Sequence, residues 1–451
     1  MEHLLHYVWK HKLLPLRELH TTDGRLVDVI HSGLHNRDAG PDFFNAKVKI
    51  GGQLWVGNVE IHLRSSDWFR HRHDTNAAYD NVILHVVETA DADISYPHRP
   101  QQAIPQLELP IPDVVRQRYA ALTANDTLPY CRDIVARQPR LTIHSWLSAL
   151  QVERLEQRTR QLMERHERCD RNWEHTLFVT LARNFGFGIN GAALEQWARS
   201  IPLTAVAKHR DDLFQIEAIF FGQSGLLETT EKSHKNGEFT DKINTADPYV
   251  DRLKKEYAYL RHKFEIFPMD STIFRFARIR PQNFPHIRIA QLAMLHYEQR
   301  ATFSRLISAE SIEEIRSLFD VSVSPFWQTH FTFSSAESRP SKRQLSDRSK
   351  DLLIINSIAP LLFAYGRYKG DETLCERAFH LLEQVEPEQN NVTRTWANAG
   401  IDCESAADSQ ALIQLTRNYC EPRDCLRCRF GHEYIRRHPD FLHEADEQAA
   451  F

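Results

Sequence analysis

The chain has 451 residues, with 42% hydrophobic and 26% charged residues and a formal net charge of −4. These values are ordinary for a globular protein of two or three domains. The slightly acidic balance gives no global signal for binding to nucleic acid or to a membrane surface. No apolar run approaches the roughly 20 residues of a membrane span, and the N-terminus lacks the features of a signal peptide. We therefore expect a cytoplasmic protein with no membrane partner.

The first part of the chain predicts strands that alternate with helices. Apolar residues recur at helical spacing near the N-terminus, and β-branched or alternating runs follow. The expected elements are a helix over residues 2–13, strands over 26–31, 43–50 and 54–63, a short helix beginning near Ser65, and a buried strand over 82–87. A Pro-rich connection and a helix over 113–124 complete this α/β domain, which we place at residues 1–135.

Two of these strands are predicted to form a hairpin. In the first, Phe44, Ala46, Val48 and Ile50 alternate with polar residues, which is typical of a half-buried strand. Gly51-Gly52 then predicts a tight turn into the second strand.

Acidic and histidine side chains gather on this hairpin. Glu60 and His62 lie two residues apart on the second strand, so both side chains leave the same face, and Asp42 precedes the first strand. The turn can bring Asp42 beside Glu60. Two converging carboxylates make an oxygen-rich site for Mg²⁺ or Mn²⁺, at which His62 can bind the metal or deprotonate a water. Such a set suits metal-assisted phosphodiester hydrolysis.

This pattern resembles the nuclease superfamily named for its PD-(D/E)xK signature. The resemblance rests on Pro41-Asp42 and Glu60-Ile61-His62, in the order helix, three strands, helix, strand. It implies a restriction-endonuclease-like fold with a mixed sheet, in which Asp42 and Glu60 are metal ligands and the carbonyl of Ile61 is a further one. His62 stands where the superfamily has Lys, so whether the site is catalytic stays open. The alternative is a surface hairpin with solvated side chains.

Further candidate ligands follow the hairpin: His71, His73, Asp74 and His85. His73 and Asp74 could bind a transition metal together with His62. His85 interrupts a buried strand, and we expect it to be a hydrogen-bonded core histidine.

The remaining residues, 136–451, are predicted to form a mostly α-helical domain. Amphipathic segments follow one another, beginning with a long and highly charged one over 143–168. Basic residues cluster at 154–168, and a groove with such a lining can bind phosphates in a protein that has no net positive charge. Nucleic acid is therefore a candidate partner.

The strongest spacing signal is Cys420-x4-Cys425-x2-Cys428 near the C-terminus. A CxxC turn places two thiolates on one tight loop, which is the geometry that holds zinc or an iron of an Fe–S cluster. Either His432, just downstream, or Cys403, upstream, could be the fourth ligand. Both sets suit a structural Zn²⁺, which we expect, whereas a 4Fe–4S cluster would require Cys403. The other cysteines are isolated, which fits a reducing compartment. The alternative is that the cluster binds no metal.

Several longer segments resemble a bacterial family catalogued only as a domain of unknown function. They include GPDFFNAKVKI, GNVEIHLRSSDW, LARNFGFGIN and RPQNFPHIRIAQLA, and they span nearly the whole chain. This resemblance predicts one continuous family fold and implies no activity.

The function expected from the sequence is metal-dependent hydrolysis of nucleic acid. Asp42 and Glu60 would be the ligands, and His62 the base or a further ligand. The alternative is a non-catalytic module that keeps a nuclease-like fold in order to bind nucleic acid or protein.

Overall fold

The computed structural model describes residues 2–13, 18–36, 39–124, 126–228, 232–235, 238–241 and 247–437. The chain forms two compact units. Unit 1 comprises Met1–Gln138 and Thr416–Phe451, and unit 2 comprises Pro139–Leu415. Both ends of the chain therefore belong to unit 1.

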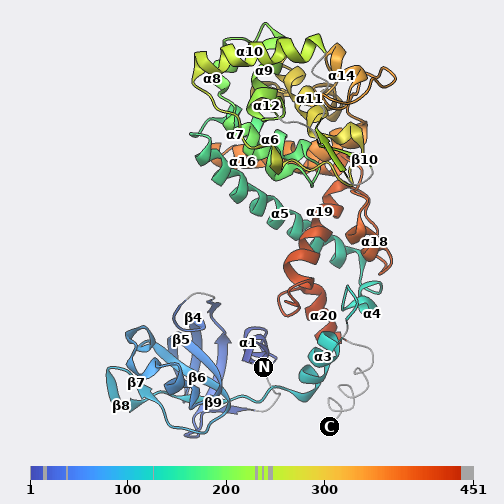
Figure 1. Ribbon diagram of the computed structural model, residues 1–451. Helices are drawn as coiled ribbons and strands as arrows, with labels where there is room; N and C mark the ends of the chain where they lie inside the picture. The colour runs from blue at the N-terminus through green and yellow to red at the C-terminus, as the bar shows by residue number, and fades with distance from the viewer. Residues whose placement is uncertain are drawn as a thin grey trace. The chain divides into compact units, whose positions relative to one another are not determined.

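The core of unit 1 is a mixed, seven-stranded sheet (Figure 1). The strand order is β1-β2-β4-β5-β6-β9, with β3 beside β4. Neighbours are antiparallel from β1 to β5, whereas β6 is parallel to both β5 and β9. The strands are β1 (Leu19–His20), β2 (Leu26–His31), β3 (Leu34–His35), β4 (Phe43–Ile50), β5 (Gln53–Arg64), β6 (Val82–Thr89) and β9 (Gln106–Glu108). The α/β character predicted for this part of the chain is confirmed.

Unit 1 also contains short helices. Helix α1 (Glu2–Lys10) packs against β5 and buries Leu4, Leu5, Val8 and Trp9. From the C-terminal segment, α20 packs against α3. The remaining elements are α2 (Asp67–Arg70), η1 (His73–Thr75), η2 (Ala77–Tyr79), β7 (Ser95–Tyr96), β8 (Arg99–Ala103), α3 (Asp113–Ala124), α4 (Arg132–Val135), η6 (Thr416–Cys420) and α20 (Arg429–Arg437).

The β4–β5 hairpin differs from the prediction in one respect. Its turn forms at Gly51-Gly52 as predicted. The buried residue at the start of β4 is Phe43 instead of Phe44, because a bulge interrupts the alternation. Within the bulge Asn45 has a φ of 53°, in the left-handed region that Asn tolerates better than most residues.

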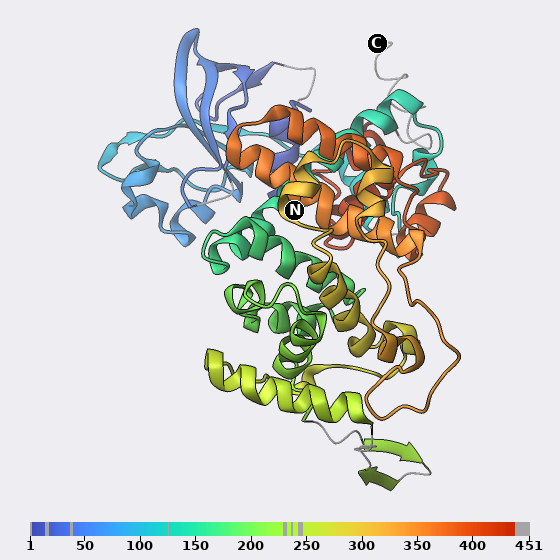
Figure 2. The same cartoon turned by 90° about the horizontal axis from the view of Figure 1, so that it is seen from above.

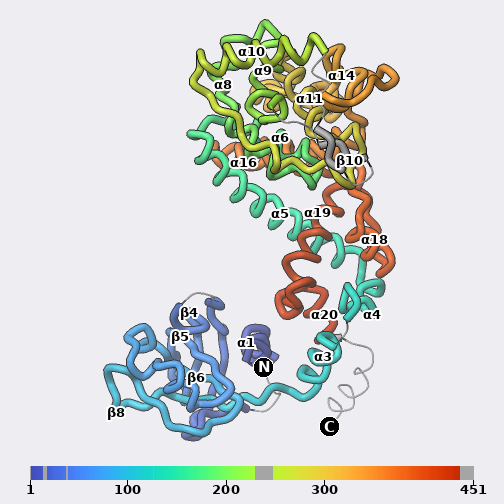
Figure 3. Tube along the Cα trace, viewed as in Figure 1, coloured from blue at the N-terminus to red at the C-terminus, as the bar shows by residue number. Residues whose placement is uncertain are grey.

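Unit 2 is mostly helical, as the sequence predicts, and its longest helix is α5 (Arg140–Arg168) (Figure 3). Helices α6, α16 and α19 pack along α5. Figure 2 shows the other helices of this unit in green to red-orange. They are α6 (Trp173–Phe185), α7 (Gly191–Ser200), α8 (Leu203–Ala207), α9 (Leu213–Gln223), α10 (Pro248–Phe264), η3 (Ser271–Ile273), η4 (Pro281–Asn283), α11 (Pro285–Tyr297), α12 (Phe303–Ser308), α13 (Ile312–Ser317), α14 (Pro325–Thr329), α15 (Asp347–Leu353), η5 (Ile354–Ile358), α16 (Ala359–Lys369), α17 (Glu372–Gln384), α18 (Asn391–Ala397) and α19 (Ala406–Leu415). A small hairpin is formed by β10 (Lys232–Lys235) and β11 (Glu238–Asp241).

One continuous hydrophobic core holds unit 2 together. Its largest fully buried side chains include Trp197, Phe220, Phe221 and Trp327. In the described ranges, no helix combines the length and the apolar character that a bilayer crossing requires.

Candidate metal centre

The bulge in β4 sets the two carboxylates of the candidate site opposite each other. Between the turn and the bulge, β4 and β5 pair in a single register. Beyond the bulge this register is shifted by one residue, so that Phe43 pairs with Val59. Asp42 therefore faces Glu60 and not the next residue of β5. Because successive residues of a strand point to opposite faces, this shift decides whether both carboxylates share a face.

Backbone groups hold the two carboxylates in place. The N–H of Asp42 donates to Glu60 Oε2 at 3.1 Å, and the N–H of Ile61 donates to Asp42 Oδ2 at 2.9 Å. From α1, His6 Nε2 lies 3.4 Å from Asp42 Oδ2. Glu60 is only 4% exposed, so the site brings an acidic pair into a largely buried environment.

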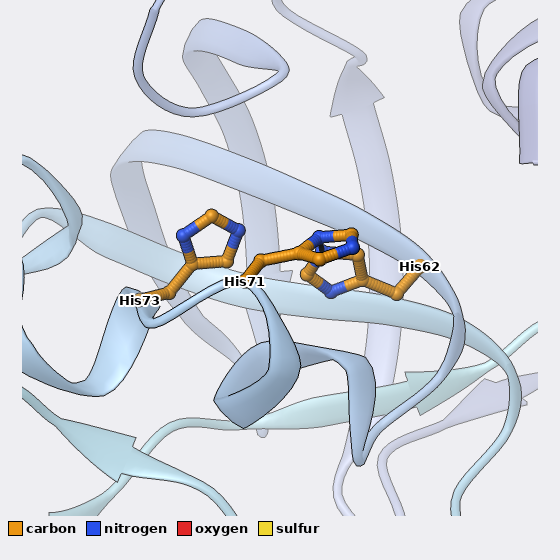
Figure 4. Close-up of side chains that lie close together, drawn as sticks. All are labelled: His62, His71 and His73. Carbon is orange, nitrogen blue, oxygen red and sulfur yellow. Dashed lines mark hydrogen bonds between the residues drawn. The ribbon is translucent and has the colours of Figure 1, made fainter.

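Three imidazoles lie beside Glu60 (Figure 4). His62 comes from β5, and His71 and His73 come from the segment that follows α2. The donor atoms of these three histidines all lie within 4.8 Å of one another. His62 Nε2 is 3.1 Å from His71 Nδ1, and Glu60 Oε1 is 3.1 Å from His73 Nε2 and 3.5 Å from His62 Nε2. One carboxylate and three imidazoles thus converge on one small volume.

Aromatic packing orients His73. Its ring stacks on Tyr79 with the centroids 3.9 Å apart, and it meets Trp68 edge-on at 5.4 Å. Trp68 and Tyr79 belong to a small buried apolar cluster of unit 1. Between the two histidines of this segment, Arg72 adopts a φ of 60°, which turns the chain between His71 and His73.

His85, on the neighbouring strand β6, contacts the other nitrogen of His62. His62 Nδ1 is 2.8 Å from His85 Nε2. His85 is fully buried, which agrees with the expectation of a hydrogen-bonded core histidine. If His62 donates its Nδ1 proton to His85, the lone pair on its Nε2 is left for a metal.

Burial acts on the carboxylates and the imidazoles in opposite directions. It raises the pKa of Glu60, and the neighbouring Asp42 carboxyl raises it further. Burial also raises the pKa of Asp42. In contrast, burial lowers the pKa of His62 to about 2 and that of His6 to about 4, and it lowers the pKa of His73 as well. These imidazoles are therefore neutral near pH 7 and offer lone pairs instead of positive charge.

This donor set fits a divalent cation. Neutral imidazoles have no positive charge with which to compensate two carboxylates in this environment. A divalent cation would compensate them, since it would displace the protons from the carboxyl groups that bind it. Donor atoms about 2.1 Å from a tetrahedral metal lie about 3.4 Å from one another, which is close to the spacing around Glu60. The residues that could hold such an ion are Asp42, Glu60, His62, His71 and His73.

The three C-terminal cysteines lie in unit 1, from the last residue of η6 to the start of α20. They are all buried, with 7%, 8% and 6% exposure for Cys420, Cys425 and Cys428. Of the two residues predicted as a fourth ligand, His432 directs Nδ1 to the Tyr7 hydroxyl at 2.7 Å. Cys403 belongs to unit 2, where burial raises its pKa to about 12.

The structure brings together Asp42, Glu60 and His62, the three residues predicted to be catalytic. It adds His71 and His73 to them, and it also adds His6, which was not among the predicted site residues. His6 lies on a helix whose apolar spacing predicts its buried face, but only the packing of that helix on β5 brings its imidazole to Asp42.

A family model described as "Protein of unknown function (DUF2851)" matches residues 2–391. The chain belongs to this family. No curated protein and no solved structure matches the chain. The family match includes all residues of the carboxylate–histidine site and ends before the C-terminal cysteines of this DUF2851 member.

Proposed function

We propose that this DUF2851 member is a divalent-metal-dependent hydrolase of phosphodiester bonds in nucleic acid. The observation that carries the proposal is the convergence of Asp42 and Glu60 with the imidazoles of His62, His71 and His73. The succession Pro41-Asp42 and Glu60-Ile61-His62 on adjacent strands supports this reaction class through its resemblance to the PD-(D/E)xK nucleases.

The ligand chemistry assigns a role to each side chain. Asp42 and Glu60 bind the metal through oxygen, and the histidines bind it through nitrogen. The low pKa of His62, about 2 because of burial, makes it a poor proton acceptor and a better ligand. A bound metal would supply an activated water and stabilise charge on the phosphate. Mixed imidazole and carboxylate ligands favour Zn²⁺ or Mn²⁺ over Mg²⁺.

A basic groove in unit 2 supports nucleic acid as the substrate class. Its volume is about 540 Å³. Five arginines line it, against two acidic residues, Glu164 and Glu195. The arginines are Arg158, Arg165 and Arg168 of α5, Arg183 of α6 and Arg199 of α7. Guanidinium groups are well suited to phosphate contacts because they donate in a planar fork.

The test combines metal binding with cleavage by the full-length protein. We expect calorimetry to detect Zn²⁺ or Mn²⁺ binding, and the metal-loaded protein to cleave DNA or RNA. Glu60→Gln and His71→Ala should each weaken metal binding by about tenfold or more, because each removes a donor atom. The matched controls are Glu108→Gln and His98→Ala, which change an exposed carboxylate and an exposed imidazole of the same unit.

The outcomes separate the enzyme from its alternative. Metal binding that depends on Glu60 and His71, without cleavage of any DNA or RNA, would favour the non-catalytic module. A protein that binds neither Zn²⁺ nor Mn²⁺ would contradict the metal centre itself.

A further inference from the structure

A fourth cysteine, distant in the sequence, lies on a segment that packs against the loop of the C-terminal three. Cys131 is 6% exposed, and Cys420, Cys425 and Cys428 are buried as well. Cys131 directly follows Tyr130, and the ring of Tyr130 lies under the guanidinium of Arg423, 4.9 Å from the ring centroid. Since Arg423 belongs to the loop between Cys420 and Cys425, this contact brings the two segments together.

The loop that carries the three C-terminal cysteines is closed by its own backbone. The N–H of Asp424 donates to the carbonyl of Tyr419 at 2.7 Å, and the N–H of Arg423 donates to that of Cys420 at 2.9 Å. The N–H of Cys428 donates to the carbonyl of Cys425 at 3.2 Å. These bonds hold the sulfurs on a compact loop without the help of a metal.

Glycine is required where α20 meets this loop. A Cβ on Gly431 would lie 2.1 Å from the carbonyl oxygen of Cys425. No side chain can be accommodated at that distance from a backbone oxygen, so Gly431 permits the loop to sit directly on the first turn of α20.

Arg423 connects the loop to the segment that carries Cys131. Its guanidinium lies over the Tyr130 ring, 4.9 Å from the centroid, and donates to Asp126 Oδ1 at 3.0 Å. It also donates to the carbonyl of Thr123, at the end of α3. Tyr130 immediately precedes Cys131, so these contacts hold the fourth thiol against the loop. Helices α3 and α20 lie side by side next to them (Figure 1).

We propose that Cys131, Cys420, Cys425 and Cys428 form a four-thiolate metal centre, with Cys131 as the fourth ligand in place of His432 or Cys403. Four thiolates and no nitrogen ligand suit either a structural zinc ion or a [4Fe–4S] cluster. The centre joins the two separate chain segments that make up unit 1.

The ligand type bears on the identity of the metal. A [4Fe–4S] cluster takes one thiolate at each of its four irons, and this set supplies four thiolates and no nitrogen ligand, so we expect the cluster.

The experiment is metal and acid-labile sulfide analysis of the full-length protein purified without oxygen. We expect about four iron atoms and four sulfides per chain, with the visible absorption of an iron–sulfur cluster. Cys131→Ser and Cys425→Ser should both lose the metal and the colour. The matched control is Cys169→Ser, which changes a buried thiol of unit 2 and should keep both.

A second set of measurements does not depend on the folding of the Cys131 variant. Cys403→Ser and His432→Ala should retain the full metal content, and X-ray absorption at the metal edge of the wild-type protein should show sulfur ligands without nitrogen. Loss of metal in Cys403→Ser, a nitrogen ligand, or full metal content in Cys131→Ser would overturn the four-thiolate set. Stoichiometric zinc without iron or sulfide would overturn the cluster assignment.

Discussion

At the scale of single residues, burial changes the ionisation of carboxyl groups in both units. Glu217 of α9 is 2% exposed and accepts hydrogen bonds from Ser324 Oγ at 2.7 Å and from the Tyr249 hydroxyl at 2.9 Å. Burial still raises the pKa of Glu217 to about 7, because two hydroxyl donors do not replace the hydration of a charge. This carboxyl lies far in the sequence from the metal ligands and therefore reports on unit 2.

We predict that Glu217 makes unit 2 less stable as the pH rises from about 4.5 to about 7. In this window the carboxyl of the unfolded chain ionises while the folded one keeps its proton, since the folded pKa is the higher. The whole effect is about 3 kcal/mol. Glu217→Gln keeps a neutral side chain of the same shape and should remove this slope. Denaturant unfolding between about pH 5 and pH 8 measures it.

The control for this prediction is Glu376→Gln, which changes an exposed carboxylate of α17. It should leave the slope unchanged. If Glu217→Gln and the wild-type protein show the same dependence on pH, the buried carboxyl is not the group responsible.

At the scale of elements, the bulge in β4 decides the geometry of the metal site. The Gly51-Gly52 turn alone would set a register in which Asp42 and Glu60 point to opposite faces. The bulge adds one residue to β4, which brings both carboxylates to the same face of the sheet. It requires Asn45 to adopt a left-handed φ of 53°. The sheet therefore carries a local irregularity next to the residues that need it, as is common for bulges.

We predict that Asn45→Val destabilises unit 1 by about 1–2 kcal/mol and weakens metal binding. A β-branched side chain disfavours the left-handed conformation, and relaxation of the bulge moves Asp42 away from Glu60. Asn45→Gly should retain both properties, since Gly adopts this conformation readily. Thermal unfolding and calorimetric titration with Zn²⁺ or Mn²⁺ test both variants. Unchanged metal affinity in Asn45→Val would show that the register does not depend on this residue.

The arginine groove of α5, α6 and α7 allows a second prediction at this scale. Arg168→Ala should reduce the slope of log K against log salt by about 1 for nucleic-acid binding, because it removes one phosphate contact. Arg171→Ala is the control, since Arg171 is exposed just after α5 and pairs with Glu167. Equal slopes in the two variants would exclude the groove as the binding surface.

At the scale of the whole molecule, unit 1 is assembled from both ends of the chain. Helix α20 buries Phe430, Tyr434 and Ile435. The guanidinium of Arg118, on α3, donates to the carbonyl of Ile435 at 2.7 Å. The C-terminal segment thus packs on α3 in unit 1, while unit 2 has a hydrophobic core of its own.

We predict that removal of residues 416–451 lowers the stability of unit 1 and leaves unit 2 unaffected. Loss of the burial contributed by these three large side chains, at about 2 kcal/mol each, amounts to about 6 kcal/mol. Calorimetry should show two transitions in the full chain, of which only one moves after truncation. Phe430→Ala should move the same transition by a smaller amount, and a shift of both transitions would contradict the division into two units.

The sequence by itself determined the class of each part and the core of the candidate site. Helices, strands and the Gly51-Gly52 turn depend on residues a few positions apart, so periodicity and turn chemistry are sufficient to predict them. For the same reason Glu60 and His62 could be assigned to one face of one strand. Family membership followed from long matching segments.

Only the tertiary structure decided which further side chains join these residues. His6 reaches Asp42 from a helix, and His73 reaches Glu60 from a crossover segment that also brings His71 to His62. The segment of Cys131 meets a loop near the other end of the chain. The bulge at Asn45 likewise appears only when two strands pair. These features depend on how distant segments pack against one another. The free energy of that packing is a sum over contacts of the whole chain, and a local sequence pattern does not contain it.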